Sequence, residues 1–146
     1  MKKWTFLFVG MFLFNMVLWA GNDKPIQVSE MPKAAQQFIK NHFPNQSVAM
    51  AKVEKEFMDK NYDVVFTDGS KLEFDKKGHW TKVDCGHNEV PLAIVPMAIR
   101  KYVSQNYPNA KVQKIELTDH KGYEVDLNNG FEIKFDKRMK VVDIDR

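Results

Sequence analysis

Hydrophobic and polar residues follow two different periods along this chain, and the first of them predicts two helices. Each predicted helix starts at a proline, Pro32 or Pro96, where a missing backbone N–H costs little. Each ends before Pro44 or Pro108, because the residue before a proline avoids helical geometry. Apolar side chains between these prolines recur at helical spacing, which predicts one buried face: Ala35, Phe38, Ile39 and Phe43, then Ile99, Tyr102, Val103 and Tyr107.

After each helix the period changes to two, which predicts half-buried strands. The dipeptides Asp68-Gly69 and Asn129-Gly130 favour tight turns between antiparallel neighbours, because such turns need positive φ. The predicted inward residues are Tyr62, Val64, Phe66, Leu72 and Phe74, and Tyr123, Val125, Leu127, Ile133 and Phe135. Further strands are predicted over 48–57 and 79–85, and over 112–118 and 141–145.

The two halves of the chain match each other with a period of roughly 60 residues, longer than the common solenoid repeats. The matching pairs include Phe43-Pro44-Asn45 with Tyr107-Pro108-Asn109, Lys52-Val53-Glu54 with Lys114-Ile115-Glu116, and Phe74-Asp75-Lys76 with Phe135-Asp136-Lys137. We therefore predict an α+β protein of two αββββ repeats, 29–85 and 92–146, with 86–91 as a linker. We expect the repeats to form one curved antiparallel sheet, with both helices on the same face.

The first twenty residues predict a secretory signal peptide. Lys2 and Lys3 precede an apolar run from Trp4 to Ala20, and polar residues follow it. A membrane anchor is the alternative, although the run is slightly shorter than the ~20 residues of a spanning helix and contains Asn15. With cleavage near Ala20, the protein is periplasmic or secreted and not inserted in a membrane, and 21–28 is an N-terminal linker.

Charge and cysteine content exclude two classes of protein. The formal net charge of +3 falls to +1 when Lys2 and Lys3 are removed with the signal peptide, and the remaining basic residues form no stripe. The chain therefore lacks the electrostatic footprint of a nucleic-acid binder. Because Cys85 is the only cysteine, no intramolecular disulfide can form, so a packed core must supply the stability.

These motifs resemble the PepSY-like family, also called β-lactamase-inhibitor-like, of small exported bacterial proteins. The resemblance rests on the proline-led helix ending in Phe/Tyr-Pro-Asn, the Tyr-x-Val run before a turn glycine, the Phe-Asp-Lys turn, and Gly78-His79-Trp80 leading to Val83-Asp84-Cys85. It implies a tandem αββββ architecture, a role in binding or inhibiting another protein, and no catalytic set. The β-lactamase-inhibitor branch uses disulfides and an aromatic-rich sheet, which this chain lacks.

Candidate chemistry is sparse. Cys85 and His87 beside Asp84 form the only local group of metal-ligand types, and a zinc site needs at least one further ligand. No base is certain to contact Cys85, and no Gly-rich loop is present to form an oxyanion hole. We therefore expect Cys85 to be a small apolar residue at the end of a strand rather than a nucleophile. Asp75 and Asp136 suit turn openings better than calcium sites. We predict no catalytic residue, no metal site and no cofactor.

The sheet face away from the helices is the predicted binding surface. Alternation places five carboxylates there, those of Asp63, Glu73, Glu124, Asp126 and Glu132, with Lys71 and Lys134 among them. Such a face is the default product of antiparallel alternation. Counting back from inward Val83 and Cys85 also puts Trp80 and Lys82 on this face, and exposed aromatics often anchor interfaces. The candidate partner-binding residues are Trp80, Lys82, Asp63, Glu73, Glu124 and Asp126.

Two functions remain open at this point. In the first, the protein is a non-catalytic module that binds or inhibits an envelope or secreted protein through the open face. In the second, it is a periplasmic protein that binds or senses a small ligand held between helices and sheet. A closely packed helix–sheet interface favours the first function, and an apolar pocket that the core does not need favours the second.

Overall fold

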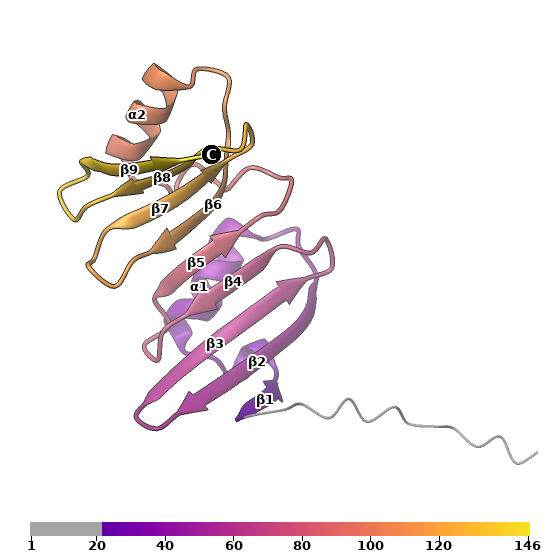
Figure 1. Cartoon of the computed structure of the whole chain (residues 1–146). Helices are drawn as coiled ribbons and strands as arrows, with labels where there is room; N and C mark the ends of the chain where they lie inside the picture. Colours follow the sequence, from indigo (N-terminus) through magenta and orange to yellow (C-terminus); the bar gives the residue numbers. More distant parts are fainter. Residues whose placement is uncertain (1–21) are drawn as a thin grey trace, which may run out of the picture.

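The computed structural model describes residues 22–146, which form one nine-stranded antiparallel sheet and two α-helices (Figure 1). The strands pair in chain order without a crossover. They are β1 (Asp23–Ile26), β2 (Val48–Glu56), β3 (Asp59–Phe66), β4 (Lys71–Phe74), β5 (Trp80–Asp84), β6 (Val112–Leu117), β7 (Tyr123–Leu127), β8 (Glu132–Phe135) and β9 (Val141–Asp145). The helices are α1 (Lys33–His42) and α2 (Met97–Asn106), and a short 3₁₀ helix covers Val28–Glu30. The predicted α+β class and antiparallel sheet are confirmed.

The N-terminal part of the chain departs from the sequence-based expectation. The predicted signal peptide, 1–20, lies outside the described residues. Residues 23–26, predicted to be linker, form β1 and pair with β2. Ile26 lies opposite Ala51, and the carboxylate of Asp23 accepts a hydrogen bond from Lys52 Nζ at 2.7 Å. Within residues 22–146 no helix is long and apolar enough to cross a membrane.

Both helices are amphipathic, as their spacing predicts, and each starts one residue later than expected. Pro32 and Pro96 have extended backbone with φ near −54° and −53°, and each precedes its helix as the N-cap residue. The fully helical residues begin at Lys33 and Met97. The side chains that the helices bury are Ala35 and Ile39 in α1, and Ile99 and Val103 in α2.

A single row of apolar residues crosses all nine strands on the helix-covered face. Neighbours in the row lie directly opposite each other in the sheet register, so their side chains point to the same side. The row runs Ile26, Ala51, Val64, Leu72, Val83, Ile115, Val125, Ile133 and Ile144. Its members from Ala51 to Ile133 are buried. The core is thus one continuous layer rather than two separate ones.

The pairing of β5 with β6 joins the two repeats. Val83 lies opposite Ile115, and both side chains are fully buried. The inward faces of the two repeats therefore coincide, and both helices must cover the same side. Phe38 of α1 contacts Phe74 edge-on with 5.5 Å between ring centroids, and Tyr102 of α2 contacts Phe135 in the same way at 5.5 Å. The predicted single sheet with both helices on one face is confirmed.

The turn before β5 depends on a glycine at Gly78, which leads to our first prediction. Gly78 has a φ of +85°, and a Cβ added there would lie 2.8 Å from Pro32 Cβ and 2.9 Å from the backbone nitrogen of Ala35. We expect Gly78→Ala to lower the free energy of unfolding by about 2–4 kcal/mol, because it combines backbone strain with a clash against the start of α1. Chemical denaturation measures this change.

Gly69→Ala is the matched control. Gly69 has a similar φ of +90°, but an added Cβ would have no neighbour within 4 Å. Its substitution should cost only the backbone strain, about 1–2 kcal/mol. Equal losses of stability in the two variants would show that α1 does not press on the Gly78 turn.

Candidate functional site

A row of charged side chains crosses the open face of the sheet, one from each of strands β2 to β9. Neighbours in the row are again directly opposite each other in the register. The row, called here the central charge row, is Lys52, Asp63, Glu73, Lys82, Glu116, Glu124, Lys134 and Asp143. Two carboxylates follow each lysine until the last strand. The β5–β6 pairing makes the row continuous, because Lys82 of the first repeat lies opposite Glu116 of the second.

Each lysine of the central charge row bridges carboxylates. Lys82 Nζ lies 3.8 Å from Glu73 and 3.7 Å from Glu116. Lys52 Nζ lies 2.7 Å from Asp23 and 3.3 Å from Asp63, and the hydrogen bond to Asp23, followed by the one to Asp63, raises the pKa of Lys52 despite partial burial. Since these side chains are partly exposed, each ion pair contributes little to stability by itself.

Glu73 shows what the surroundings do to a carboxylate in this row. Burial, reinforced by the nearby charges of Asp63 and Glu116, raises its pKa above the usual range, while Lys82 acts in the opposite direction. Asp63 lies directly opposite Glu73 in the register. Repulsion between these opposed carboxylates thus adds to the effect of burial on the pKa of Glu73, and Lys82 offsets part of the two together.

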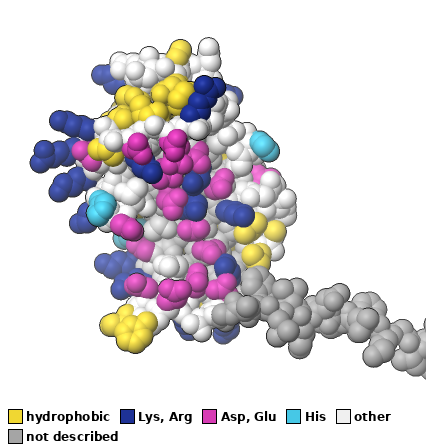
Figure 2. Space-filling model, viewed as in Figure 1, with side chains coloured by type: hydrophobic (Ala, Val, Ile, Leu, Met, Phe, Trp, Pro, Cys, Tyr) yellow, Lys and Arg dark blue, Asp and Glu magenta, His cyan; other side chains and the backbone are white. Residues whose placement is uncertain are grey.

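A second row of charges lies beside the first and becomes wholly acidic towards β9. It runs Lys71, Asp84, Lys114, Asp126, Glu132 and Asp145. Partial burial would lower the pKa of Lys114, but the carboxylates of Asp126, Glu116 and Glu124 outweigh this effect and raise it. Figure 2 shows acidic side chains gathered along the middle of the face that the strands present, with lysines among them.

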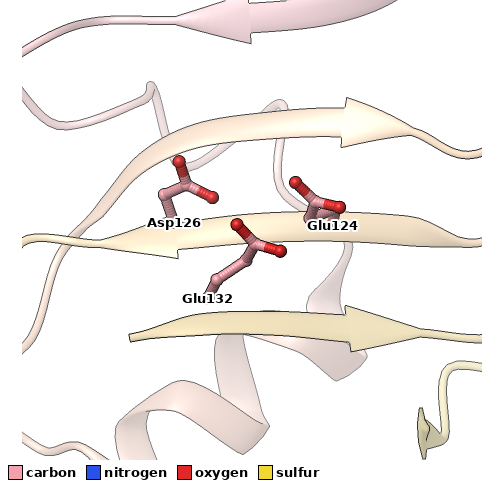
Figure 3. A group of neighbouring side chains, drawn as sticks. All are labelled: Glu124, Asp126 and Glu132. Atoms are coloured by element: carbon pink, nitrogen blue, oxygen red, sulfur yellow. The ribbon is translucent and has the colours of Figure 1, made fainter. Parts of the chain in front are cut away.

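Three carboxylates lie close together on β7 and β8, one from the central charge row and two from the second row. Glu124, Asp126 and Glu132 each offer one oxygen, and these oxygens all lie within 4.8 Å of one another (Figure 3). Asp126 Oδ1 is buried and has no hydrogen-bond partner among the described residues. Two lysines form ion pairs with this group: Lys114 Nζ lies 3.4 Å from Asp126, and Lys134 Nζ lies 3.5 Å from Glu132. Oxygen ligands of this kind suit a hard cation such as Ca²⁺.

The structure places five of the six candidate partner-binding residues on the open face. Asp63, Glu73, Lys82 and Glu124 belong to the central charge row, and Asp126 lies in the second row. Three further residues of this face were not predicted from the sequence: Lys52 and Lys114, which pair with these carboxylates, and Glu116, which pairs with Lys82 and Lys114. The pairing of Glu132 with Asp126 could have been predicted from the sequence, because the Asn129-Gly130 turn sets these two residues opposite each other.

Trp80 is the exception, because it lies on the helix-covered face. The pairing of β4 with β5 shifts by one residue: Glu73 lies opposite Lys82, but Phe74 lies opposite Trp80, which leaves Thr81 as an extra residue in a β-bulge. Counting alternate residues back from Val83 therefore gives the wrong side. The Trp80 ring lies 6.5 Å from that of Phe38 in α1 and 6.3 Å from that of Tyr123 in β7.

A small cleft lies beside Trp80, between side chains of the first and the second repeat. Its volume is about 330 Å³, and its lining includes Phe38, Leu117 and Tyr123. The cleft lies at the rim of the helix–sheet layer, where these side chains are half-buried. Deeper in that layer, residues such as Val64, Leu72 and Ile99 have no exposed surface, so helix and sheet are closely packed.

The other candidate groups have structural roles. Cys85 is buried, and burial raises the pKa of its thiol to about 11, whereas His87 is exposed. The Asp84 carboxylate accepts a hydrogen bond from the backbone N–H of Gly86. Asp75 accepts hydrogen bonds from the N–H groups of Lys77 and His79, and Asp136 from those of Arg138 and Lys140, so both aspartates stabilise turns.

Comparison with known proteins agrees with this architecture. The family model described as "putative beta-lactamase-inhibitor-like, PepSY-like" matches residues 60–143. A "putative periplasmic protein" of the DUF2874 family from Bacteroides vulgatus is 60% identical, with a TM-score of 0.84 over 87% of this chain and 99% of that one. A second such protein from B. vulgatus, of unknown function, is 40% identical, with a TM-score of 0.79 over 85% of this chain and 99% of that one.

A "putative calcium-regulated periplasmic protein" from Bacteroides thetaiotaomicron is 57% identical, with a TM-score of 0.81 over 85% of this chain and 97% of that one. No curated protein matches the chain. The family model covers more than half of the sequence, and these relatives match over nearly their whole length. The chain belongs to the PepSY-like family.

Proposed function

We propose that this protein is an exported, non-catalytic binding module whose open sheet face binds a basic surface of an envelope or secreted protein. The observation that carries the proposal is the acidic charge of that face. The central charge row has three lysines and five carboxylates, and the second row has two lysines and four carboxylates. This excess of four negative charges would steer a basic partner and fix its orientation.

The packing and the relatives support a protein partner over an enclosed ligand. The helix–sheet interior is closely packed, with Val64, Leu72 and Ile99 fully buried. The family is described as β-lactamase-inhibitor-like, and three relatives are described as periplasmic. Binding through Lys82, Asp63, Glu73, Glu124 and Asp126 would be electrostatic, because Trp80 lies on the other face of the sheet.

Affinity capture with a charge variant tests this proposal. The immobilised protein should enrich a basic partner from the exported fraction of the cells that produce it. The variant Glu124→Gln/Asp126→Asn should retain at least tenfold less of that partner, because it removes two charges from the open face. About 0.5 M salt should release the partner from the wild type, since ions screen exposed charges. Quantitative mass spectrometry measures the amounts retained.

The variant Glu89→Gln/Asp119→Asn is the matched control. It makes the same two chemical changes at exposed positions outside the charge rows: Glu89 lies beside Leu92 and Met97, and Asp119 lies in the β6–β7 loop. The control should capture the partner as the wild type does. Equal capture by wild type and open-face variant would rule out the open face as the binding surface.

Calcium sensing is a second candidate function, and it differs from the alternative of a small ligand held between helices and sheet. It is favoured by the cluster of Glu124, Asp126 and Glu132, and by the description of the 57% identical relative as calcium-regulated. A bound Ca²⁺ would take oxygen ligands from the three carboxylates and water for the remaining positions. Because Lys114 and Lys134 already neutralise part of the cluster, the ion would have to displace their ammonium groups.

Calcium titration followed by calorimetry tests the second candidate. We expect a dissociation constant on the order of 10⁻⁴–10⁻³ M, as in extracellular modules. Asp126→Asn should weaken binding at least tenfold, because it removes one ligand charge. Asp63→Asn is the control, since Asp63 occupies the matching position to Glu124 in the first repeat, where the cluster is absent: Val65 and Lys71 stand in place of Asp126 and Glu132. An equal loss in both variants would refute binding at this cluster.

The proposed structural role of Cys85 also has a direct test. With a pKa of about 11, roughly a thousandth of the thiol is thiolate at pH 8, and the side chain is buried. Iodoacetamide should therefore leave Cys85 unmodified in the native protein and label it fully in denaturant, as measured by intact mass. Rapid labelling of the native protein would indicate an accessible, activated thiol and contradict its structural role.

A further inference from the structure

Strand β9 presents an edge that is unpaired among the described residues. It pairs with β8 on one side, and no other strand of residues 22–146 lies on its outer side. An unpaired edge offers backbone N–H and C=O groups to any chain that can lie alongside it. The opposite edge of the sheet, β1, has four residues and contains Pro25, which has no N–H to donate. The two edges therefore differ in their capacity to accept a strand.

The first repeat shows what a strand paired to β9 would look like. Matching Asp75 with Asp136 places β5 and β9 at the same position of their repeats, with Val83 equivalent to Ile144. In the first repeat β6 pairs with the outer edge of β5, and Val83 is 0% exposed. In the second repeat the equivalent Ile144 is 44% exposed. The apolar row of the core thus ends in a side chain that lacks the neighbour its counterpart has.

The β-bulge in β9 does not prevent such pairing. Bulges often protect a sheet edge by twisting it away from incoming strands. In β9 the register shifts around Val142, and in β5 it shifts around the equivalent Thr81. Because β5 accepts β6 while carrying the same bulge, the backbone of β9 is compatible with a further strand. Val142 itself is 64% exposed.

Charge determines which strand fits. In the first repeat, Lys82 and Asp84 flank Val83 on the open face, and they lie opposite Glu116 and Lys114 of β6. In β9 the flanking residues are Asp143 and Asp145, so the complementary strand needs a basic residue at both positions and an apolar residue between them. The β5–β6 pair thus supplies the geometry, and the two aspartates change the charge that it selects.

A second copy of this chain does not meet that requirement. Antiparallel pairing of β9 with itself would set aspartates against aspartates, which is unfavourable. Pairing of β9 with β1 of another copy would offer Asp23 and Pro25 on the open face, because Asp23 lies opposite Glu54 and Pro25 opposite Lys52. Neither arrangement supplies the two basic residues.

We propose that the outer edge of β9 binds an extended segment of a partner protein in which an apolar residue lies between two basic residues, as a tenth antiparallel strand. The backbone of β9 supplies the hydrogen bonds, the apolar residue covers Ile144, and the basic residues pair with Asp143 and Asp145. The backbone hydrogen bonds distinguish this edge from the face proposed above to bind a partner, although Asp143 and Asp145 also belong to the two charge rows of that face.

Fluorescence anisotropy with two labelled peptides tests the proposal on the full chain. The peptide Thr-Val-Lys-Ile-Lys-Val-Thr should bind at least tenfold more tightly than Thr-Val-Glu-Ile-Glu-Val-Thr. The variant Asp143→Lys/Asp145→Lys should reverse this preference, because it reverses the charge of the edge at two exposed positions. Hydrogen exchange should show that the lysine peptide slows the amides of residues 142–145 in the wild type. An unchanged preference in the edge variant, or protection elsewhere only, would overturn the proposal.

The open-face variant Glu124→Gln/Asp126→Asn separates this site from the acidic face. It should keep the preference for the lysine peptide, because its substitutions lie in β7, two strands from the edge. If this variant loses the preference while the edge variant keeps it, the peptide binds the face, which would overturn the edge proposal and support the face. Loss of partner capture with an intact peptide preference would support both proposals, with the partner on the face and the peptide on the edge.

Discussion

The pairing of β5 with β6 is the constraint on which the rest of the molecule depends. Three opposed pairs, Lys82 with Glu116, Val83 with Ile115 and Asp84 with Lys114, set the register between the repeats. Because a shift of one residue would move every side chain to the other face, this register aligns both the core row and the charge rows. It also makes both helices cover the same side. Two αββββ units thereby become one sheet with one buried and one open face.

The open face is not arranged for maximum stability. Four pairs of carboxylates in the two charge rows lie directly opposite each other: Asp63 with Glu73, Glu116 with Glu124, Asp126 with Glu132, and Glu132 with Asp145. Like charges in such positions are destabilising, and strict alternation of lysine with carboxylate would avoid them. The raised pKa of Glu73 reflects its burial and these neighbours. The buried apolar core stabilises the fold, so the open face can tolerate an excess of negative charge. The proposed function depends on that excess.

Most of the fold follows from the period of the apolar residues, and the departures have identifiable physical causes. The helices, the strands after them and the inward residues such as Val64 and Ile133 are all evident in the pattern. Trp80 was placed on the wrong face because the bulge at Thr81 interrupts the alternation, and a bulge leaves no mark in the hydrophobic pattern. Strand β1 was missed because it is short and contains Pro25, which is unusual in a strand interior.

The candidate site was only partly predictable for a different reason. Alternation assigns each carboxylate to a face, but the rows arise from register between strands that are distant in sequence. Lys82 and Glu116, for example, meet only through the junction of the repeats. The hairpin turn at Asn129-Gly130 fixes the local register that brings Glu132 to Asp126. Local pairs can therefore be read from turns, whereas pairs across the junction require the structure.

Lysine footprinting of the complex with the captured partner tests the central claim, that the open face is the binding surface, most directly. The extent of acylation of each lysine is measured by mass spectrometry with and without the partner. The account predicts that the partner protects Lys82, Lys114 and Lys134 on the open face, and that Lys33, Lys40 and Lys101 on the helices react equally in both samples. Protection of the helix lysines with unchanged labelling of the open face would contradict it.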